Sequence, residues 1–73
     1  MSGGAFGGLE PEMNIGRQVR KFNTAIQMYR NSGEHEKADY MEHLRELMLS
    51  EADKDRPRPF SHYYPQFQEE FGE

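Results

Sequence analysis

His35, Asp39 and His43 are the residues of this sequence whose types and spacing come closest to a metal-binding set. They recur every four residues, so on a helix they project from one side, and two imidazoles with a carboxylate can hold zinc. However, eight residues of helix separate the two histidines by about 12 Å, which is too far for one ion. We therefore interpret the set as a solvated helix face and expect no metal or other cofactor.

Residues suited to catalysis do not form a recognisable set. The sequence has no cysteine, and its four serines fall in predicted tails, a turn and a helix end. Paired carboxylates such as Glu42 and Glu46 are predicted on an exposed helix face, where they lack the burial that acid–base catalysis requires. No glycine-rich loop follows a predicted strand. We expect a protein that is not an enzyme.

Charge is distributed unevenly along the 73 residues, whose net charge is −4. Residues 12–30 have four basic residues against one acid, whereas residues 34–55 have eight acids against three basic residues. Arg17, Arg20 and Lys21 form a basic helix face that suits a phosphate contact. The acidic second segment and the isoelectric point near 5.3 argue against nucleic acid as the primary ligand.

Composition limits the fold to one small domain. Hydrophobic residues make up 34% of the chain, charged residues 30%, and mean hydropathy is −1.06. Without cysteine, the core has to form without disulfides. No run approaches the roughly 18 apolar residues of a membrane span, and the first eight residues have neither the basic nor the apolar region of a signal peptide. We therefore expect a cytoplasmic protein without membrane contact.

Two amphipathic stripes predict two helices. Apolar residues recur at helical spacing from Ile15 to Tyr29 and again from Tyr40 to Met48. The Asn31-Ser32-Gly33 sequence predicts a tight turn between them, because asparagine and glycine tolerate the left-handed conformation. The two helices should therefore pack as an antiparallel hairpin.

The limits of this hairpin follow from proline and glycine. Glu10-Pro11-Glu12 predicts a helix start, because proline suits the first helical position and acids favour the positive end of the helix dipole. Pro57 ends the second helix. The predicted organisation is an all-α domain, with a flexible glycine-rich arm over 1–9, a helical hairpin over 10–55 and an aromatic tail over 56–73.

The aromatic tail begins with an extended connector at Arg56-Pro57-Arg58-Pro59. Five aromatic residues follow within twelve positions: Phe60, Tyr63, Tyr64, Phe67 and Phe71. Pro65 suits the first position of a short third helix that ends at Phe71.

The aromatic tail can either complete the core of the hairpin or bind a partner. A two-helix hairpin buries too little apolar surface to offset the entropy of ordering the chain, so either the tail or a second copy in a homodimer must cover it. One interpretation completes the core with Phe60, Tyr64 and Phe67. The other makes the tail a docking peptide, since aromatic residues and arginine are favoured at interfaces. We expect a mixture, in which Phe60 and one tyrosine pack on the hairpin while Phe67 and Phe71 stay accessible. The candidate partner contacts are Phe6, Arg56, Arg58, Tyr63, Phe67 and Phe71.

Ala25, Tyr29, Gly33 and Ala38 give the hairpin a resemblance to one tetratricopeptide unit, which implies two helices joined by a tight turn. That family needs small or apolar residues further along, where this sequence has Glu42 and Arg45, and a solenoid needs about three copies. The resemblance therefore describes a generic helical hairpin.

At class level, the chain is similar to small phage-encoded proteins that bind and inhibit a host machine such as RNA polymerase. Those proteins are short, cysteine-poor single domains with flexible ends, and the likeness implies a type of partner only. We expect a non-enzymatic regulator that binds a larger protein machine through its tail aromatics, its glycine-rich arm or its acidic second helix. Two alternatives remain: a nucleic-acid-associated protein that uses the basic first helix and the tail aromatics, and a structural subunit of a larger assembly.

Overall fold

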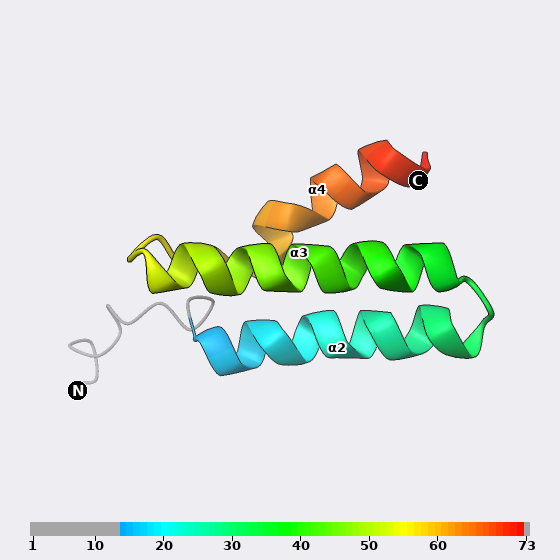
Figure 1. The fold of residues 1–73 in the computed structure, drawn as a ribbon, viewed down its shortest axis with the longest axis horizontal. Helices are drawn as coiled ribbons and strands as arrows, with labels where there is room; N and C mark the ends of the chain where they lie inside the picture. Colours follow the sequence, from blue (N-terminus) through cyan, green and yellow to red (C-terminus); the bar gives the residue numbers. More distant parts are fainter. Residues whose placement is uncertain (1–13, 73) are drawn as a thin grey trace, which may run out of the picture.

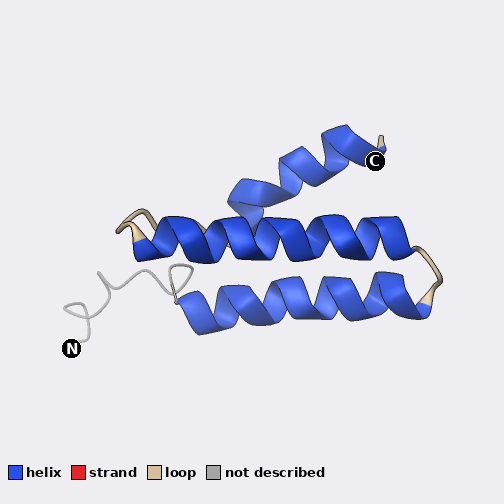
Figure 2. Ribbon diagram, viewed as in Figure 1, coloured by secondary structure: helices blue, strands red, loops and turns tan. Residues whose placement is uncertain are grey.

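All regular structure in the described part of the chain is helical. The computed structural model describes residues 14–72, in which α2 spans Ile15–Asn31, α3 spans His35–Asp53 and α4 spans Phe60–Phe71. No strand occurs in this range (Figure 2). The predicted all-α class is therefore confirmed. The glycine-rich arm with Phe6, and the helix start expected at residues 10–12, lie outside the described residues.

Helix α2 begins later than the sequence predicted. Asn14 has an extended backbone, and its side-chain oxygen accepts a hydrogen bond of 3.0 Å from the N–H of Arg17. An N-cap of this kind satisfies one of the donors that the first turn leaves open. Because Asn14 has an extended backbone, α2 begins at Ile15, and a helix from residues 10–12 would be interrupted at Asn14.

The turn between α2 and α3 closes at Gly33, as expected. Glu34 N–H donates to Tyr29 O at 2.8 Å and Gly33 N–H donates to Arg30 O at 3.1 Å. These two bonds form a Schellman motif, whose penultimate residue takes a left-handed conformation, and Gly33 has φ +81°. The turn reverses the chain, so α2 and α3 run antiparallel side by side (Figure 1).

Helix α3 ends with the same motif but without glycine. Arg56 N–H donates to Glu51 O at 2.8 Å and Asp55 N–H donates to Ala52 O at 3.0 Å. Asp55 therefore occupies the left-handed position, with φ +65°. Helix α3 therefore ends at Asp53, shortly before Pro57, which was expected to prevent its continuation. The extended segment through Pro59 then leads to α4.

Helix α4 is longer than predicted, because Pro65 lies inside it and not at its start. A proline in a helix interior removes one backbone hydrogen bond and costs about 3 kcal/mol. Starting at Phe60 places Phe60, Tyr63, Phe67 and Phe71 on one face of a single helix. Burying this aromatic face stabilises the helix by more than the proline costs, since each ring can bury about 150–250 Å².

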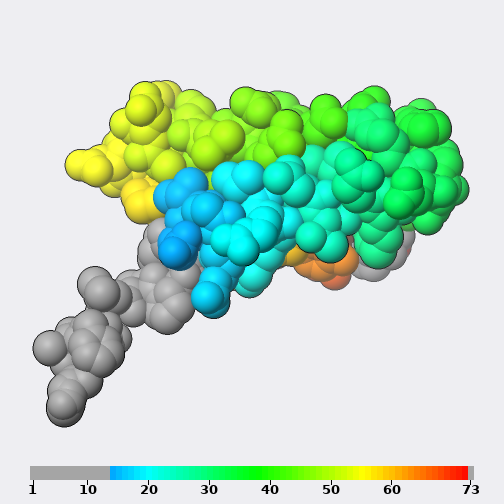
Figure 3. All heavy atoms as spheres, turned by 90° about the horizontal axis from the view of Figure 1, so that it is seen from below, coloured from blue at the N-terminus to red at the C-terminus, as the bar shows by residue number. Residues whose placement is uncertain are grey.

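The core lies where the three described helices meet. Seen from below, α2 lies in front, with α3 above it and part of α4 showing beneath it (Figure 3). Aromatic contacts join α4 to the hairpin: Phe60 lies 4.8 Å from Phe22, and Phe67 lies 5.4 Å from Tyr29, between ring centroids. The fully or almost fully buried apolar residues are Phe22, Ile26, Ala38, Met41, Leu44, Met48, Tyr63 and Phe67. Among residues 14–72, no helix combines the length and apolarity needed to cross a membrane.

Candidate functional site

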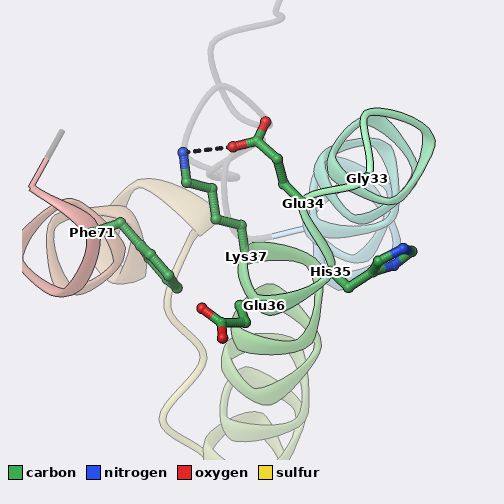
Figure 4. Close-up of a pocket in the computed structure, with 6 residues that line it drawn as sticks. All are labelled: Gly33, Glu34, His35, Glu36, Lys37 and Phe71. Carbon is green, nitrogen blue, oxygen red and sulfur yellow. Dashed lines mark ion pairs between the residues drawn. The ribbon is translucent and has the colours of Figure 1, made fainter.

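The histidines that suggested metal binding do not converge. His35 points away from the neighbouring side chains of its turn (Figure 4). His43 lies about two turns further along α3, with its ring centroid 6.0 Å from that of Tyr40. Within residues 14–72, no group of three or more His, Asp or Glu residues is placed to hold a metal ion. These histidines therefore define no site.

A groove opens where the last turn of α4 lies against the first turns of α3. Its first part, of about 410 Å³, is open to solvent and is lined by Gly33, Glu34, His35, Glu36, Lys37 and Phe71. The ring of Phe71 projects from α4 toward α3, and the Glu36 carboxylate lies beside it (Figure 4). The groove thus depends on α4 being docked on the hairpin.

A second hollow of similar volume continues the first along α3. It shares two residues with the first part, and its lining is Glu36, Asp39, Tyr40, His43, Glu70 and Phe71. We call the two parts together the acidic groove. They combine carboxylates from α3 with Glu70 and Phe71 from the end of α4, which are more than thirty residues away in sequence.

Carboxylates dominate the electrostatics of the acidic groove. The Lys37 ammonium lies 2.9 Å from Glu34, and the Arg30 guanidinium lies 3.5 Å from Asp39 and also bonds Glu42. Glu36 and Glu70 have no ion-pair partner among the described residues. The groove therefore retains negative charge that a cationic group can neutralise.

Aromatic rings supply the apolar walls of the acidic groove. Tyr40 and Phe71 meet nearly perpendicularly, with ring centroids 5.6 Å apart. The Lys37 ammonium lies 5.6 Å from the ring centroid of Tyr29 and 6.0 Å from that of Phe71. Rings at this distance attract cations through their quadrupole. Carboxylates beside aromatic faces suit the recognition of lysine or arginine side chains.

The predicted partner contacts divide into three groups. Arg56 and Arg58 are exposed, and Phe71 is half-buried in the wall of the acidic groove. Tyr63 and Phe67 are only 1% and 0% exposed, because both lie on the face of α4 that packs on the hairpin. The expectation that Phe67 remains accessible in the free chain is therefore wrong. Tyr63 is covered in the same way, and its contact with a partner stays a prediction.

Sequence reasoning missed the residues that make the groove acidic. Asp39 was assigned only to a solvated helix face, and neither Glu36 nor Glu70 was given a role in binding. Their combination with Phe71 depends on where α4 crosses α3, and no spacing along the chain records that crossing. The many acidic residues between positions 34 and 55 could have predicted a negatively charged surface. They could not have predicted which aromatic rings lie beside it.

Neither a protein-family model, nor a curated protein, nor a solved structure matches this chain. Functional inference therefore rests on the three-helix fold of the described residues and on the acidic groove.

Proposed function

We propose that this protein is a non-enzymatic regulator that binds a basic segment of a larger protein in its acidic groove. One observation carries the proposal: Glu36 and Glu70, two carboxylates without an ion-pair partner among the described residues, line the same hollow as the rings of Tyr40 and Phe71. A lysine or arginine of the partner gains charge neutralisation and ring contact at the same place. The half-buried Phe71 serves as an apolar contact at the centre of such an interface.

The partner type follows from the likeness to small phage-encoded inhibitors. We propose a cytoplasmic machine with exposed basic segments, and RNA polymerase is the first to test. Binding would modulate that machine by occupying one of its basic segments. A homodimer is not needed to complete the core, since α4 already covers the hairpin in a single chain.

The test uses two double variants with the same change in charge. Glu36→Lys/Glu70→Lys reverses the acidic groove, while Asp53→Lys/Glu69→Lys reverses two exposed carboxylates outside it. Each tagged protein is used for affinity purification from the native cell, followed by mass spectrometry. We expect the wild type and the control to retain one common partner that the groove variant loses. Equal recovery with both variants would refute the groove as the docking site.

A titration with a defined probe localises the contact. A short arginine-rich peptide added to isotopically labelled protein should shift the amide signals of the groove residues, Tyr40 and Phe71 among them. The peptide should not shift the signals of Glu69 or Asp53 to the same extent. Shifts spread evenly over all acidic residues would indicate unspecific charge attraction and would contradict a defined site.

A further inference from the structure

A second charged surface lies at the opposite end of the hairpin from the acidic groove. It consists of Arg17, Arg20 and Lys21 on α2 together with Arg58 in the connector before α4, and we call it the basic surface. All four residues are exposed. None of them has an ion-pair partner among the described residues, whereas Arg30, Lys37 and Arg45 each pair with a carboxylate.

One hydrogen bond brings the two parts of the basic surface together. The N–H of Phe60 donates to the side-chain oxygen of Gln18 at 2.7 Å. Arg58 lies two residues before Phe60, and Gln18 lies between Arg17 and Lys21 on α2. The Arg58 guanidinium is 3.5 Å from the His62 ring, which keeps it at the start of α4. The connector that contains Arg58 is therefore held at the same end of α2 as Arg17, Arg20 and Lys21.

The basic surface is arranged unfavourably for the stability of the isolated chain. Arg17 lies in the first turn of α2, at the positive end of the helix dipole, and that turn has no acidic residue. Helix α2 has no acid anywhere along Ile15–Asn31. Among the described residues, the carboxylates at the end of α3, which are Glu51, Asp53 and Asp55, form no ion pair with the basic surface. The dipole and the four cations thus act together to attract an anion.

We propose that the basic surface contacts the backbone phosphates of a nucleic acid. Phosphate contacts need only cations, and the exposed α2 residues beside Arg17 and Lys21 are polar, namely Asn14 and Thr24. A membrane surface would require apolar side chains to insert beside the cations, and a peptide partner would require an aromatic anchor. The one apolar residue between Arg17 and Lys21 is Val19, which is half-buried against the core, and no aromatic residue lies between them.

This contact is separate from the proposed protein-binding site. The acidic groove is built from the start of α3 and the end of α4, and the basic surface from the start of α2 and the connector before α4 (Figure 1). Both can therefore be occupied at once. Since the whole chain has a net charge of −4, the phosphate contact should be weak at physiological salt and strengthen at low salt. With both sites occupied, the protein would contact a larger protein through the acidic groove and the nucleic acid held by that protein through the basic surface.

The test is a titration of labelled duplex DNA of about 20 base pairs, followed by fluorescence anisotropy between roughly 25 and 200 mM salt. We expect log K to fall with log salt concentration at a slope of about −3 to −4, since each neutralised phosphate contributes about −0.9. Arg20→Gln/Lys21→Gln should reduce the slope by about 2 units. Arg45→Gln, which removes a cation already bonded to Asn23 and Glu46, should leave it unchanged.

Several outcomes would overturn the proposal. The first is that duplex DNA does not bind at the lowest salt concentration. The second is that Arg20→Gln/Lys21→Gln leaves the salt slope unchanged. The third is that a polyglutamate peptide, or vesicles rich in phosphatidylserine, bind more tightly than DNA. Circular dichroism should show unaltered helicity, since all the substituted side chains are solvent-accessible. The groove variant Glu36→Lys/Glu70→Lys makes the chain more positive, so it should bind DNA no less tightly than the wild type. Failure of the protein-binding proposal would therefore not remove this contact.

Discussion

The side-chain oxygen of Gln18 in α2 accepts a hydrogen bond from the backbone N–H of Phe60, the first residue of α4, at 2.7 Å. The first N–H groups of a helix have no partner within the helix, so this bond caps α4 from a different element. Gln18 itself is fully buried, and its amide nitrogen has no hydrogen-bond partner among residues 14–72. The start of α4 is thereby attached to one residue of the hairpin.

We expect Gln18→Ala to lower the free energy of unfolding by about 2 kcal/mol, through the lost hydrogen bond and the cavity that remains. The measurement is urea denaturation followed by circular dichroism. Gln27→Ala, an exposed glutamine on the same helix, is the control and should change stability by less than about 0.5 kcal/mol. Equal effects of the two substitutions would contradict the capping role.

The aromatic face of α4 should be essential for the hairpin. Phe67 is fully buried against Tyr29 and Tyr40, so Phe67→Ala should cost about 3–5 kcal/mol. Deleting residues 56–73 should abolish most of the helical circular dichroism, because the face of the hairpin that α4 covers would be exposed. Met28→Ala is the control, since Met28 is 53% exposed and its truncation leaves no cavity. A truncated chain with full helicity would show that α2 and α3 are stable alone.

The two Schellman motifs predict opposite effects of substitution. Gly33→Ala forces a side chain into the left-handed region at φ +81°, and should destabilise by about 1–2 kcal/mol. No atom lies within 4 Å of the new Cβ, so the backbone alone causes the loss. Asp55→Gly relieves the same strain at φ +65° and should stabilise by about 0.5–1 kcal/mol. Thermal melting of both variants tests this, and effects of the same sign would contradict it.

Tyr63 should make stability depend on pH in the alkaline range. Burial raises the pKa of the Tyr63 phenol well above its ordinary value of about 10, and its hydrogen bond to the Glu51 carboxylate raises it further. Above about pH 10 the unfolded chain loses this proton while the folded chain keeps it. The free energy of unfolding must therefore fall as pH rises from about 10.

The matching variant is Tyr63→Phe. At pH 7 it should lose about 1–2 kcal/mol with the hydrogen bond to Glu51. Its stability should then fall less steeply than that of the wild type above about pH 10, so that the difference between them narrows. Urea denaturation across pH 7 to about 11 measures both slopes. Tyr64→Phe is the control and should follow the wild type; a Tyr63→Phe curve parallel to the wild type would refute the assignment.

Local signals were enough to predict α2 and α3 and the turn between them. The apolar stripes, the Asn31-Ser32-Gly33 sequence and Pro57 act within a few residues of where they stand, so their effect can be read along the chain. The start of α2 was misplaced because the acids and proline of residues 10–12 looked like a helix start. The capping side chain was Asn14, which is among the preferred N-cap residues.

Tertiary packing decided the remaining features. Pro65 locally favours a helix start, yet α4 begins at Phe60. A continuous helix places four aromatic residues on one face, of which Tyr63 and Phe67 are buried and Phe60 and Phe71 half-buried. The polar side chain of Gln18 is not one that the sequence predicts to be buried. It is buried because the free N–H at the start of α4 donates to it. The acidic groove and the basic surface each join residues about 30 or more positions apart. The sequence alone determined the charges and the amphipathic helices, and only the docking of α4, driven by aromatic burial, brought the charges together into two surfaces.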